Sequence, residues 1–326
     1  MRGIFLLIIL IVSCKNKETP SPETLVQLSD SIPYFDELLK KFPDSDSLHY
    51  NKGIYLIQNE QVDSGIIMLE KALELNPGHA NYYLSLSDAY ILAIESKKAE
   101  AIIDSAMDRF PNDVIVLLKK SRVQLILNKH LNAMATLDFI FSIDPQNAEA
   151  NYIAGHVFYE QGDTGRAIKC YQKTVDLNPE YVEGWIQLGD IMMSMKNKRA
   201  LDYYRNAIRL DSNNIETLHN YAYALQSLGN KNLAIEAYKK NIIKSPNYEL
   251  SYYNLGLMYQ EMDSCFQAIQ YLDKAIELNK EEASSYYFRA RCFIQSGRQV
   301  KAREDLKEAL RIYPNYKEAD ELLKKI

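Results

Sequence analysis

The sequence lacks the motifs that mark most enzyme and metal sites. Its four cysteines never form a Cys-x-x-Cys pair, and no histidine stands at zinc-ligand spacing from a cysteine. It has no His-Glu-x-x-His motif, no Gly-x-Ser-x-Gly motif and no glycine-rich loop that would cradle phosphate groups. We therefore predict that the chain is not an enzyme and has no catalytic residue, no metal site and no cofactor.

An excess of basic charge is absent as well. The 326 residues include 38 Lys and Arg against 43 Asp and Glu, which gives a net charge of −5. Proteins that bind nucleic acid usually present a basic stripe to its phosphates. The composition therefore argues against a nucleic-acid partner.

The apolar run at the N-terminus, Ile4–Val12, is too short to cross a bilayer, because a spanning helix needs about 20 residues. It follows Arg2 and turns polar directly after Cys14, which is the pattern of a secretory signal. Residues 1–13 are therefore predicted to be a signal peptide. A buried helix remains an alternative. Residues 14–23 contain two prolines and no apolar pattern, which predicts a tether.

The residues Ile11-Val12-Ser13-Cys14 resemble the bacterial lipoprotein box. The resemblance implies cleavage before Cys14, lipid attachment to its sulfur and a place in the bacterial cell envelope. Several acyl chains would anchor the protein firmly, since one chain alone binds a membrane only marginally. Lys15 stands where enterobacterial lipoproteins of the inner membrane have aspartate, which favours the outer membrane. The charged run Lys15–Glu18 leaves open whether the protein faces the periplasm or the cell surface, and an ordinary signal peptide that contains a cysteine remains the alternative.

Three columns of residues recur along the chain with a period of 34 residues. The first is proline at Pro43, Pro77, Pro111, Pro145 and Pro179, then at Pro246 and Pro314 after intervals of 67 and 68 residues. The second is small at Gly65, Ala99, Ala133, Ala167, Ala200, Ala234, Ala268 and Ala302. The third is small at Gly53, Ser87, Ser121, Gly155, Gly189, Ala222, Gly256 and Ala290. Because both small columns fall on predicted helices, they allow paired helices to approach closely.

Residues 221–246 show what one interval contains. Apolar residues at spacings of three and four predict two amphipathic helices, with Ala222 and Leu225 on the first and Ala234 and Tyr238 on the second. Gly229 lies between them and is free to adopt the left-handed conformation that ends a helix. Each interval is therefore predicted to be a helix–turn–helix unit.

The columns at Ala222, Gly229, Ala234, Tyr238 and Pro246, repeated at this period, resemble the tetratricopeptide repeat (TPR) family. The resemblance implies an all-α solenoid, a right-handed superhelix of helix–turn–helix repeats. We place eight repeats at residues 46–316, N-terminal capping helices at 24–45 and a C-terminal capping helix at 317–326. The fifth repeat is one residue short, and we assign the loss to its turn at 195–198, with Asn197 in place of the usual glycine.

In the family, the first helices of the repeats line a concave groove that binds an extended peptide or a partner's helix. The groove residues that this implies are Tyr50, Tyr152, His156, Asp190, His219, Tyr223, Tyr253, Tyr287 and Arg291. Tyrosine offers a large contact area at low entropic cost, so such a groove suits protein recognition. The alternative is that many tyrosines only fill the core, as we expect for Tyr171, Tyr204 and Tyr238.

Acidic residues open three successive first helices, at Glu149, Glu183 and Glu216. Together with Glu160 and Asp190 they would form an acidic patch in the groove that selects a basic partner segment. The basic residues expected around the patch are Lys119 and Arg122 on one side, and Arg289 and Arg291 towards the other end. The favoured alternative is that acidic residues at helix starts only complement the helix dipole.

Three functions follow from these expectations. The first is a lipid-anchored TPR scaffold or adaptor that mediates protein–protein interactions in the bacterial cell envelope through a tyrosine-lined groove. The second is a holdase that binds segments of exported proteins. The third is an enzyme with an unrecognised groove site, which would require His156, Asp190 and Glu160 to lie within hydrogen-bonding distance of one another.

Overall fold

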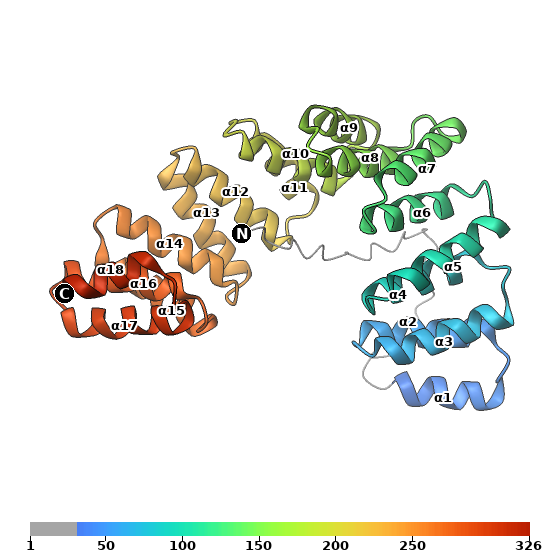
Figure 1. Ribbon diagram of the computed structural model, residues 1–326, viewed down its shortest axis with the longest axis horizontal. Helices are drawn as coiled ribbons and strands as arrows, with labels where there is room; N and C mark the ends of the chain where they lie inside the picture. The colour runs from blue at the N-terminus through green and yellow to red at the C-terminus, as the bar shows by residue number, and fades with distance from the viewer. Residues whose placement is uncertain (1–30) are drawn as a thin grey trace. The chain divides into compact units, whose positions relative to one another are not determined.

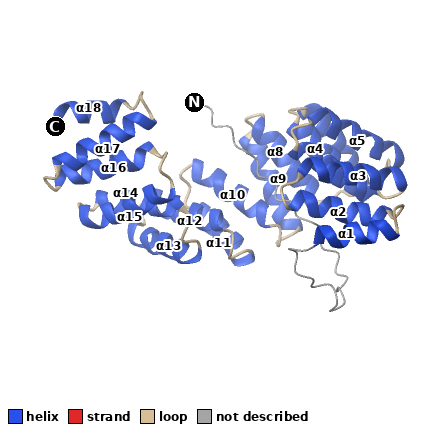
Figure 2. Cartoon of the chain, turned by 90° about the horizontal axis from the view of Figure 1, so that it is seen from below, coloured by secondary structure: helices blue, strands red, loops and turns tan. Residues whose placement is uncertain are grey.

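The computed structural model describes residues 31–326, and every regular element in that range is an α helix (Figures 1 and 2). The all-α fold is therefore confirmed. The predictions for the signal peptide, Cys14, the tether and residues 24–30 lie outside the described residues. Within residues 31–326, no helix combines the length and the apolar character needed to cross a membrane.

The helices alternate as first and second members of antiparallel pairs. The first members are α2 (Asp46–Gln58), α4 (Ala80–Leu92), α6 (Val114–Ile126), α8 (Ala148–Glu160), α10 (Val182–Ser194), α12 (Ile215–Ser227), α14 (Glu249–Glu261) and α16 (Ala283–Gln295). The second members are α3 (Val62–Leu75), α5 (Ser96–Arg109), α7 (His130–Ile143), α9 (Thr164–Leu177), α11 (Ala200–Leu210), α13 (Lys231–Lys244), α15 (Cys265–Leu278) and α17 (Gln299–Ile312). A helix α1 (Ser31–Lys41) precedes the pairs, and α18 (Lys317–Lys325) follows them.

The described residues divide into two compact units, 31–116 and Leu117–Ile326. In the first unit, α2 packs on α3, α3 on α4 and α4 on α5. In the second unit, each helix from α7 to α18 packs on the next one along the chain. Both units are therefore stacks of consecutive helices, as a solenoid requires.

The two small columns lie where the helices of each pair come closest. All sixteen of their residues are buried. A Cβ atom added to Gly155 would lie 2.6 Å from Cε1 of Tyr171, and one added to Gly189 would lie 2.6 Å from Cε1 of Tyr204. The missing side chains therefore make room for the large buried rings of the second helices, and Tyr171, Tyr204 and Tyr238 belong to the core as expected.

Each turn between paired helices has one residue with positive φ at the same place in the repeat. In chain order, these residues are Glu60, Ile94, Asn128, Gly162, Lys196, Gly229, Asp263 and Gly297. In the fifth repeat Lys196 takes this conformation, with φ of 51°, so the prediction that Asn197 replaces glycine there is wrong. The Asn197 side chain instead accepts a hydrogen bond from the backbone N–H of Arg199 at 3.0 Å.

The missing residue of the fifth repeat shortens the start of its second helix. Helix α11 has 11 residues, whereas the neighbouring second helices α9 and α13 have 14 each. Lys196 keeps the usual turn position, and Ala200 of the small column follows it one residue early. The loss therefore falls between Lys196 and Ala200, where the first turn of the helix would otherwise form.

Short helices cover the first and last pairs. In the first unit, α1 places Phe35 against Tyr55, with ring centroids 6.1 Å apart, and pairs Asp36 with Lys52 at 2.6 Å. In the second unit, α18 buries Ala319 fully against the last core cluster. Leu322, Leu323 and Ile326 pack against the same cluster, so this helix shields the apolar end of the stack.

Candidate functional site

First helices of the second unit lie side by side from α10 to α16, and Tyr152 of α8 reaches the start of α10 through its ring contact with Tyr181. Helix α10 contacts α12, α12 contacts α14 and α14 contacts α16, in addition to the contacts within pairs. We call this surface the first-helix face. Of the predicted groove residues, all except Tyr50 belong to this unit.

Tyr50 lies on α2 in the first unit. Its ring stacks on that of Tyr82, with centroids 4.8 Å apart, and its hydroxyl lies 3.0 Å from Oγ of Ser85. Both contacts join α2 to α4. Tyr50 therefore connects two successive first helices and is only partly available to a partner.

Three aromatic pairs recur on the first-helix face at every second repeat. The pairs and their centroid distances are Tyr152–Tyr181 at 5.0 Å, His219–Tyr248 at 5.3 Å and Tyr287–Tyr316 at 5.0 Å. The first member of each pair was among the predicted groove residues, whereas the second member was missed. Each missed tyrosine is the N-cap residue of the following helix, α10, α14 or α18. Because all three tyrosines directly precede a helix start, comparing the repeats in the sequence could have identified them.

The first of these pairs is surrounded by polar groups. Arg122 donates hydrogen bonds to Oε1 of Glu149, the closer one at 2.8 Å, and its Nη2 lies 3.5 Å from the hydroxyl of Tyr181. The ring of His156 meets the edge of Tyr152 at 4.6 Å. Burial, together with the positive charge of Arg122, lowers the pKa of His156 to about 4. His156 is therefore neutral near pH 7, and Glu149 is already compensated by Arg122.

In the middle pair the histidine is largely closed to solvent, whereas Tyr248 is half-buried. His219 is 8% exposed and packs against Tyr238 as well as Tyr248. Its Nε2 lies 3.4 Å from the side-chain amide nitrogen of Asn254. Burial lowers the pKa of His219 to about 4. His219 thus supports the Tyr248 ring and offers little surface of its own, while Tyr223 on the same helix is 47% exposed.

Asp190 lies between repeats on the same face. The hydroxyl of Tyr204 donates a hydrogen bond of 2.7 Å to Oδ1 of Asp190, and Asn220 approaches the same oxygen at 3.5 Å. Burial raises the pKa of Asp190 to about 6, and the charge of Glu216 acts in the same direction. Asp190 is therefore a costly buried charge at neutral pH.

Replacing Asp190 with asparagine is expected to raise the free energy of unfolding by about 1–2 kcal/mol above pH 6 and to change it little below pH 4. Because the pKa is raised in the folded state, that state binds the proton more tightly than the unfolded chain does. The carboxyl group stabilises the fold most below its unfolded pKa, and this contribution is lost as the pH rises through 6. Urea denaturation followed by the fluorescence of Trp185, the single tryptophan, measures the difference between the two proteins.

The histidines oppose this trend and serve as an internal reference. The pKa values of His156 and His219 are lowered in the folded state, so their contribution is present above pH 6.5 and is lost as the pH falls towards 4. Both proteins contain them, so the difference between variant and parent isolates Asp190. A gain of equal size at every pH would contradict the assignment.

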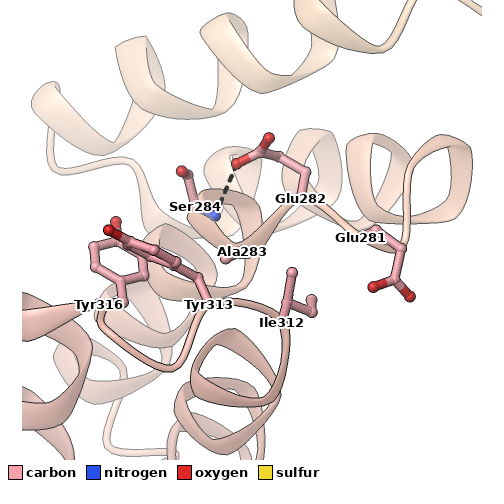
Figure 3. Close-up of a pocket in the computed structure, with 7 residues that line it drawn as sticks. All are labelled: Glu281, Glu282, Ala283, Ser284, Ile312, Tyr313 and Tyr316. Atoms are coloured by element: carbon pink, nitrogen blue, oxygen red, sulfur yellow. Dashed lines mark hydrogen bonds between the residues drawn. The ribbon is translucent and has the colours of Figure 1, made fainter. Parts of the chain in front are cut away.

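The C-terminal end of the face contains a pocket. A pocket of about 330 Å³ lies between the start of α16 and the end of α17, lined by Glu281, Glu282, Ala283, Ser284, Ile312, Tyr313 and Tyr316 (Figure 3). The Glu282 carboxylate accepts a hydrogen bond from the backbone N–H of Ser284 at 3.0 Å. The Arg291 guanidinium lies 5.9 Å from the ring centroid of Tyr287, in cation–π range.

Arg289 does not join Arg291 on this face, so that prediction is wrong. Its guanidinium pairs with Asp273 of α15 at 2.7 Å and with Asp305 of α17 at 2.6 Å. Both partners lie on second helices. The side chain therefore points away from the first-helix face and ties three helices together.

The residues of the proposed catalytic group are not brought together. Asp190 bonds to Tyr204, His156 contacts Tyr152 and Tyr171, and Glu160 lies 3.6 Å from the Nδ1 atom of His130. We therefore abandon the hypothesis of a catalytic site built from His156, Asp190 and Glu160. Over residues 31–326, no group of three or more His, Cys, Asp or Glu side chains is placed to hold a metal ion.

Four sequence models of the tetratricopeptide repeat match the chain, at residues 27–80, 155–195, 215–241 and 248–315. Together they cover more than half of it. The chain belongs to the tetratricopeptide repeat family. Members of this TPR family bind protein or peptide partners, which agrees with a face built from aromatic side chains.

Similar curated proteins have diverse names. The peroxisomal targeting signal receptor of Saccharomyces cerevisiae is 24% identical over 64% of this chain and 35% of its own length. The human protein O-mannosyl-transferase TMTC3 is 24% identical over 88% of this chain and 30% of its own length. Anaphase-promoting complex subunit 3 of Schizosaccharomyces pombe is 20% identical over 89% of this chain and 43% of its own length. The chain thus spans less than half of each of these relatives.

Two solved structures share the TPR fold. The APC/C hetero-tetramer Cut9–Hcn1 has a TM-score of 0.56 at 21% identity, covering 91% of this chain and 59% of that one. The C-terminal part of a TPR repeat-containing protein from Cytophaga hutchinsonii has a TM-score of 0.60 at 17% identity, covering 73% of this chain and 98% of that one. At these identities the likeness establishes the fold alone.

Proposed function

We propose that this TPR protein is a lipid-anchored scaffold or adaptor in the bacterial cell envelope, which docks a segment of a partner protein on its first-helix face. The observation that carries the docking proposal is the recurrence of the three aromatic pairs at equivalent places in alternate repeats. A surface with rings at regular intervals suits an extended segment whose side chains also recur at regular intervals.

The charge of the face suggests what that segment carries. Glu183 and Glu216 form no ion pair in the described part of the chain, and Asp190 bonds only to uncharged side chains. Glu149, by contrast, is compensated by Arg122. The middle of the face therefore has an unbalanced negative charge, and we propose that the partner segment combines apolar with basic residues.

The anchor proposal rests on Ile11-Val12-Ser13-Cys14 and on the polar tether that follows. Lipid on Cys14 would hold the repeats close to one membrane surface, at a distance that the tether sets. Such placement raises the effective concentration of the protein towards partners in the same membrane. Outer-membrane attachment is part of the proposal, on the grounds of Lys15.

The test compares two double variants in cells, each of which replaces two aromatic side chains with alanine. Tyr223→Ala with Tyr287→Ala alters the first-helix face, and Phe139→Ala with Phe266→Ala removes two exposed rings from second helices. After in-cell crosslinking and purification, we expect one dominant partner with the parent and the control, and at least about a tenfold loss with the face variant, since interface aromatic residues are often worth 2 kcal/mol or more.

Two results would contradict the docking proposal. Retention of the partner by the face variant and its loss from the Phe139/Phe266 control would place the interface on the second helices. A broad mixture of unfolded exported proteins would favour the holdase instead.

The anchor is tested separately with Cys14→Ser, which should move the protein from the membrane fraction to the soluble fraction and abolish its labelling by palmitate.

A further inference from the structure

Two cysteines meet in the core between the last two repeats. Cys265 is the first residue of α15, Cys292 lies in the last turn of α16, and both belong to one small cluster with Ala268. Both are buried and are present as free thiols. The Cys265 thiol is close enough to act on the pKa of the Cys292 thiol. The third described cysteine, Cys170, lies on α9, three repeats earlier.

The hydrogen bonds around the two thiols form an ordered chain. The side-chain amide of Gln260 donates to Sγ of Cys292 at 3.5 Å, and the thiol of Cys265 donates to Oε1 of Gln295 at 3.0 Å. The two thiols also pack in the same buried cluster. Burial, and then this contact with Cys265, raises the pKa of Cys292 to about 12. The two thiols are therefore close neighbours in one buried cluster.

The other repeats have no equivalent of this arrangement. The corresponding pairs of positions elsewhere in the second unit hold His130 and Val157, Thr164 and Ile191, and Lys231 and Met258. Structural need alone thus does not call for sulfur at either position. The coincidence of two cysteines at neighbouring positions of one repeat interface is what sets this pair apart.

We propose that Cys265 and Cys292 form a disulfide bond that joins the last two repeats when the chain folds in an oxidising compartment. The compartment rests on the proposed export, whereas the pairing rests on the geometry of the two side chains. The bond would constrain the unfolded chain over the 26 residues between the two cysteines and so stabilise the C-terminal end of the first-helix face.

The oxidant required is a disulfide, supplied either by a dithiol oxidase protein or by oxidised glutathione. The thiolate of Cys265, at the edge of the cluster, attacks one sulfur of that disulfide, forms a mixed disulfide and releases the first thiol. The thiolate of Cys292 then attacks Sγ of Cys265, which forms the Cys265–Cys292 bond and releases the second thiol. Two protein thiols are oxidised, one disulfide is reduced, and the two protons leave with the released thiols. Because the raised pKa of Cys292 makes its thiolate rare in the folded protein, we expect the bond to form while α16 is still packing.

The test traps free thiols in cells that produce the full chain with its own N-terminus. N-ethylmaleimide is added before lysis, and the protein is digested with trypsin without reduction. We expect peptide 245–274 linked to peptide 292–298, and maleimide on Cys170. In parallel, the reduced full chain is refolded from denaturant with oxidised glutathione, which should yield the same linked pair.

Variants separate the proposed bond from other oxidation. Cys265→Ser and Cys292→Ser should each leave the other cysteine of the pair without its partner, so that it gains glutathione and forms no crosslink. Cys170→Ser should form the bond as the parent does. Reductant should lower the unfolding midpoint of the parent and of Cys170→Ser, but not that of Cys265→Ser.

Maleimide on both Cys265 and Cys292 after refolding with oxidised glutathione would overturn the pairing. A bond that forms in this refolding but is missing from cells would overturn the oxidation of the pair in its compartment. Neither result bears on partner docking, which the crosslinking experiment measures independently.

Discussion

Replacing Arg289 with methionine is expected to lower the free energy of unfolding of the C-terminal repeats by about 3–5 kcal/mol, because it leaves a buried carboxylate without its cation. Arg289 donates to Oδ2 of Asp305 at 2.8 Å and to Oδ1 at 2.6 Å, and it also donates to Asp273 at 2.7 Å. Asp305 is only 6% exposed. Hydrogen exchange of α16 and α17 is the suitable measurement, since the repeats of a solenoid can open separately.

Matched variants distinguish the buried ion pair from a general effect of losing an arginine. Burial raises the pKa of Asp305 and Arg289 opposes that rise, so adding Asp305→Leu to Arg289→Met removes the stranded charge and should restore most of the stability. Arg311 pairs with Glu281 and Glu308 at the surface, so Arg311→Met should change stability little. Equal losses for Arg289→Met and Arg311→Met would contradict this reasoning.

The helix pairs could be predicted because their determinants are local and periodic. The small column at Gly155, Gly189 and Ala222 marks where the first helix meets a large side chain of the second. That side chain is tyrosine in these three copies and leucine or isoleucine in the others. A solenoid buries each pair only against its neighbours, so the pattern of one repeat contains most of the information about its packing. The core positions of Tyr171, Tyr204 and Tyr238 followed for this reason.

The turn of the fifth repeat could not be predicted from residue preference alone. Asn197 is the better candidate for a left-handed conformation, yet the conformation falls on Lys196. The position is imposed by the end of α10 and by the pairing of α10 with α11. The same constraint forces a positive φ of 62° on Ile94, a β-branched residue for which this conformation is strained. Tertiary position therefore outweighs local propensity in these turns.

The candidate face was only partly predictable. Comparing equivalent positions of the repeats shows which side of a helix a residue occupies, but it does not show which side chains surround that residue. It identified Tyr152 and Tyr287 but missed their partners Tyr181 and Tyr316, which come from the following helix starts. It also could not show that His219 is buried beneath Tyr248. Those features depend on contacts between consecutive repeats, which a single repeat pattern does not contain.

Replacing Gly189 with valine is expected to cost about 2–3 kcal/mol, because the structure has no space for a Cβ atom at this position. An added Cβ would lie 2.6 Å from Cε1 of Tyr204 and 2.8 Å from its Cδ1. The ring cannot retreat easily, since Tyr204 is buried and its hydroxyl donates to Asp190. Helices α10 and α11 must therefore separate, which also weakens that hydrogen bond.

Gly165 provides the control for this substitution. It lies in the first turn of α9, where an added Cβ would meet no atom closer than 3.7 Å, so Gly165→Val should change stability by less than about 0.5 kcal/mol. Urea denaturation followed by Trp185 fluorescence reports on α10 directly. In the next repeat, Ala222 takes the position equivalent to Gly189 and packs in one cluster with Tyr238. A helix pair of this kind can therefore accommodate one methyl group at this position. Gly189→Ala should accordingly lower the free energy of unfolding less than Gly189→Val does. An unchanged urea midpoint for the valine variant would contradict the argument from close packing, because α10 and α11 would then separate without loss of stability.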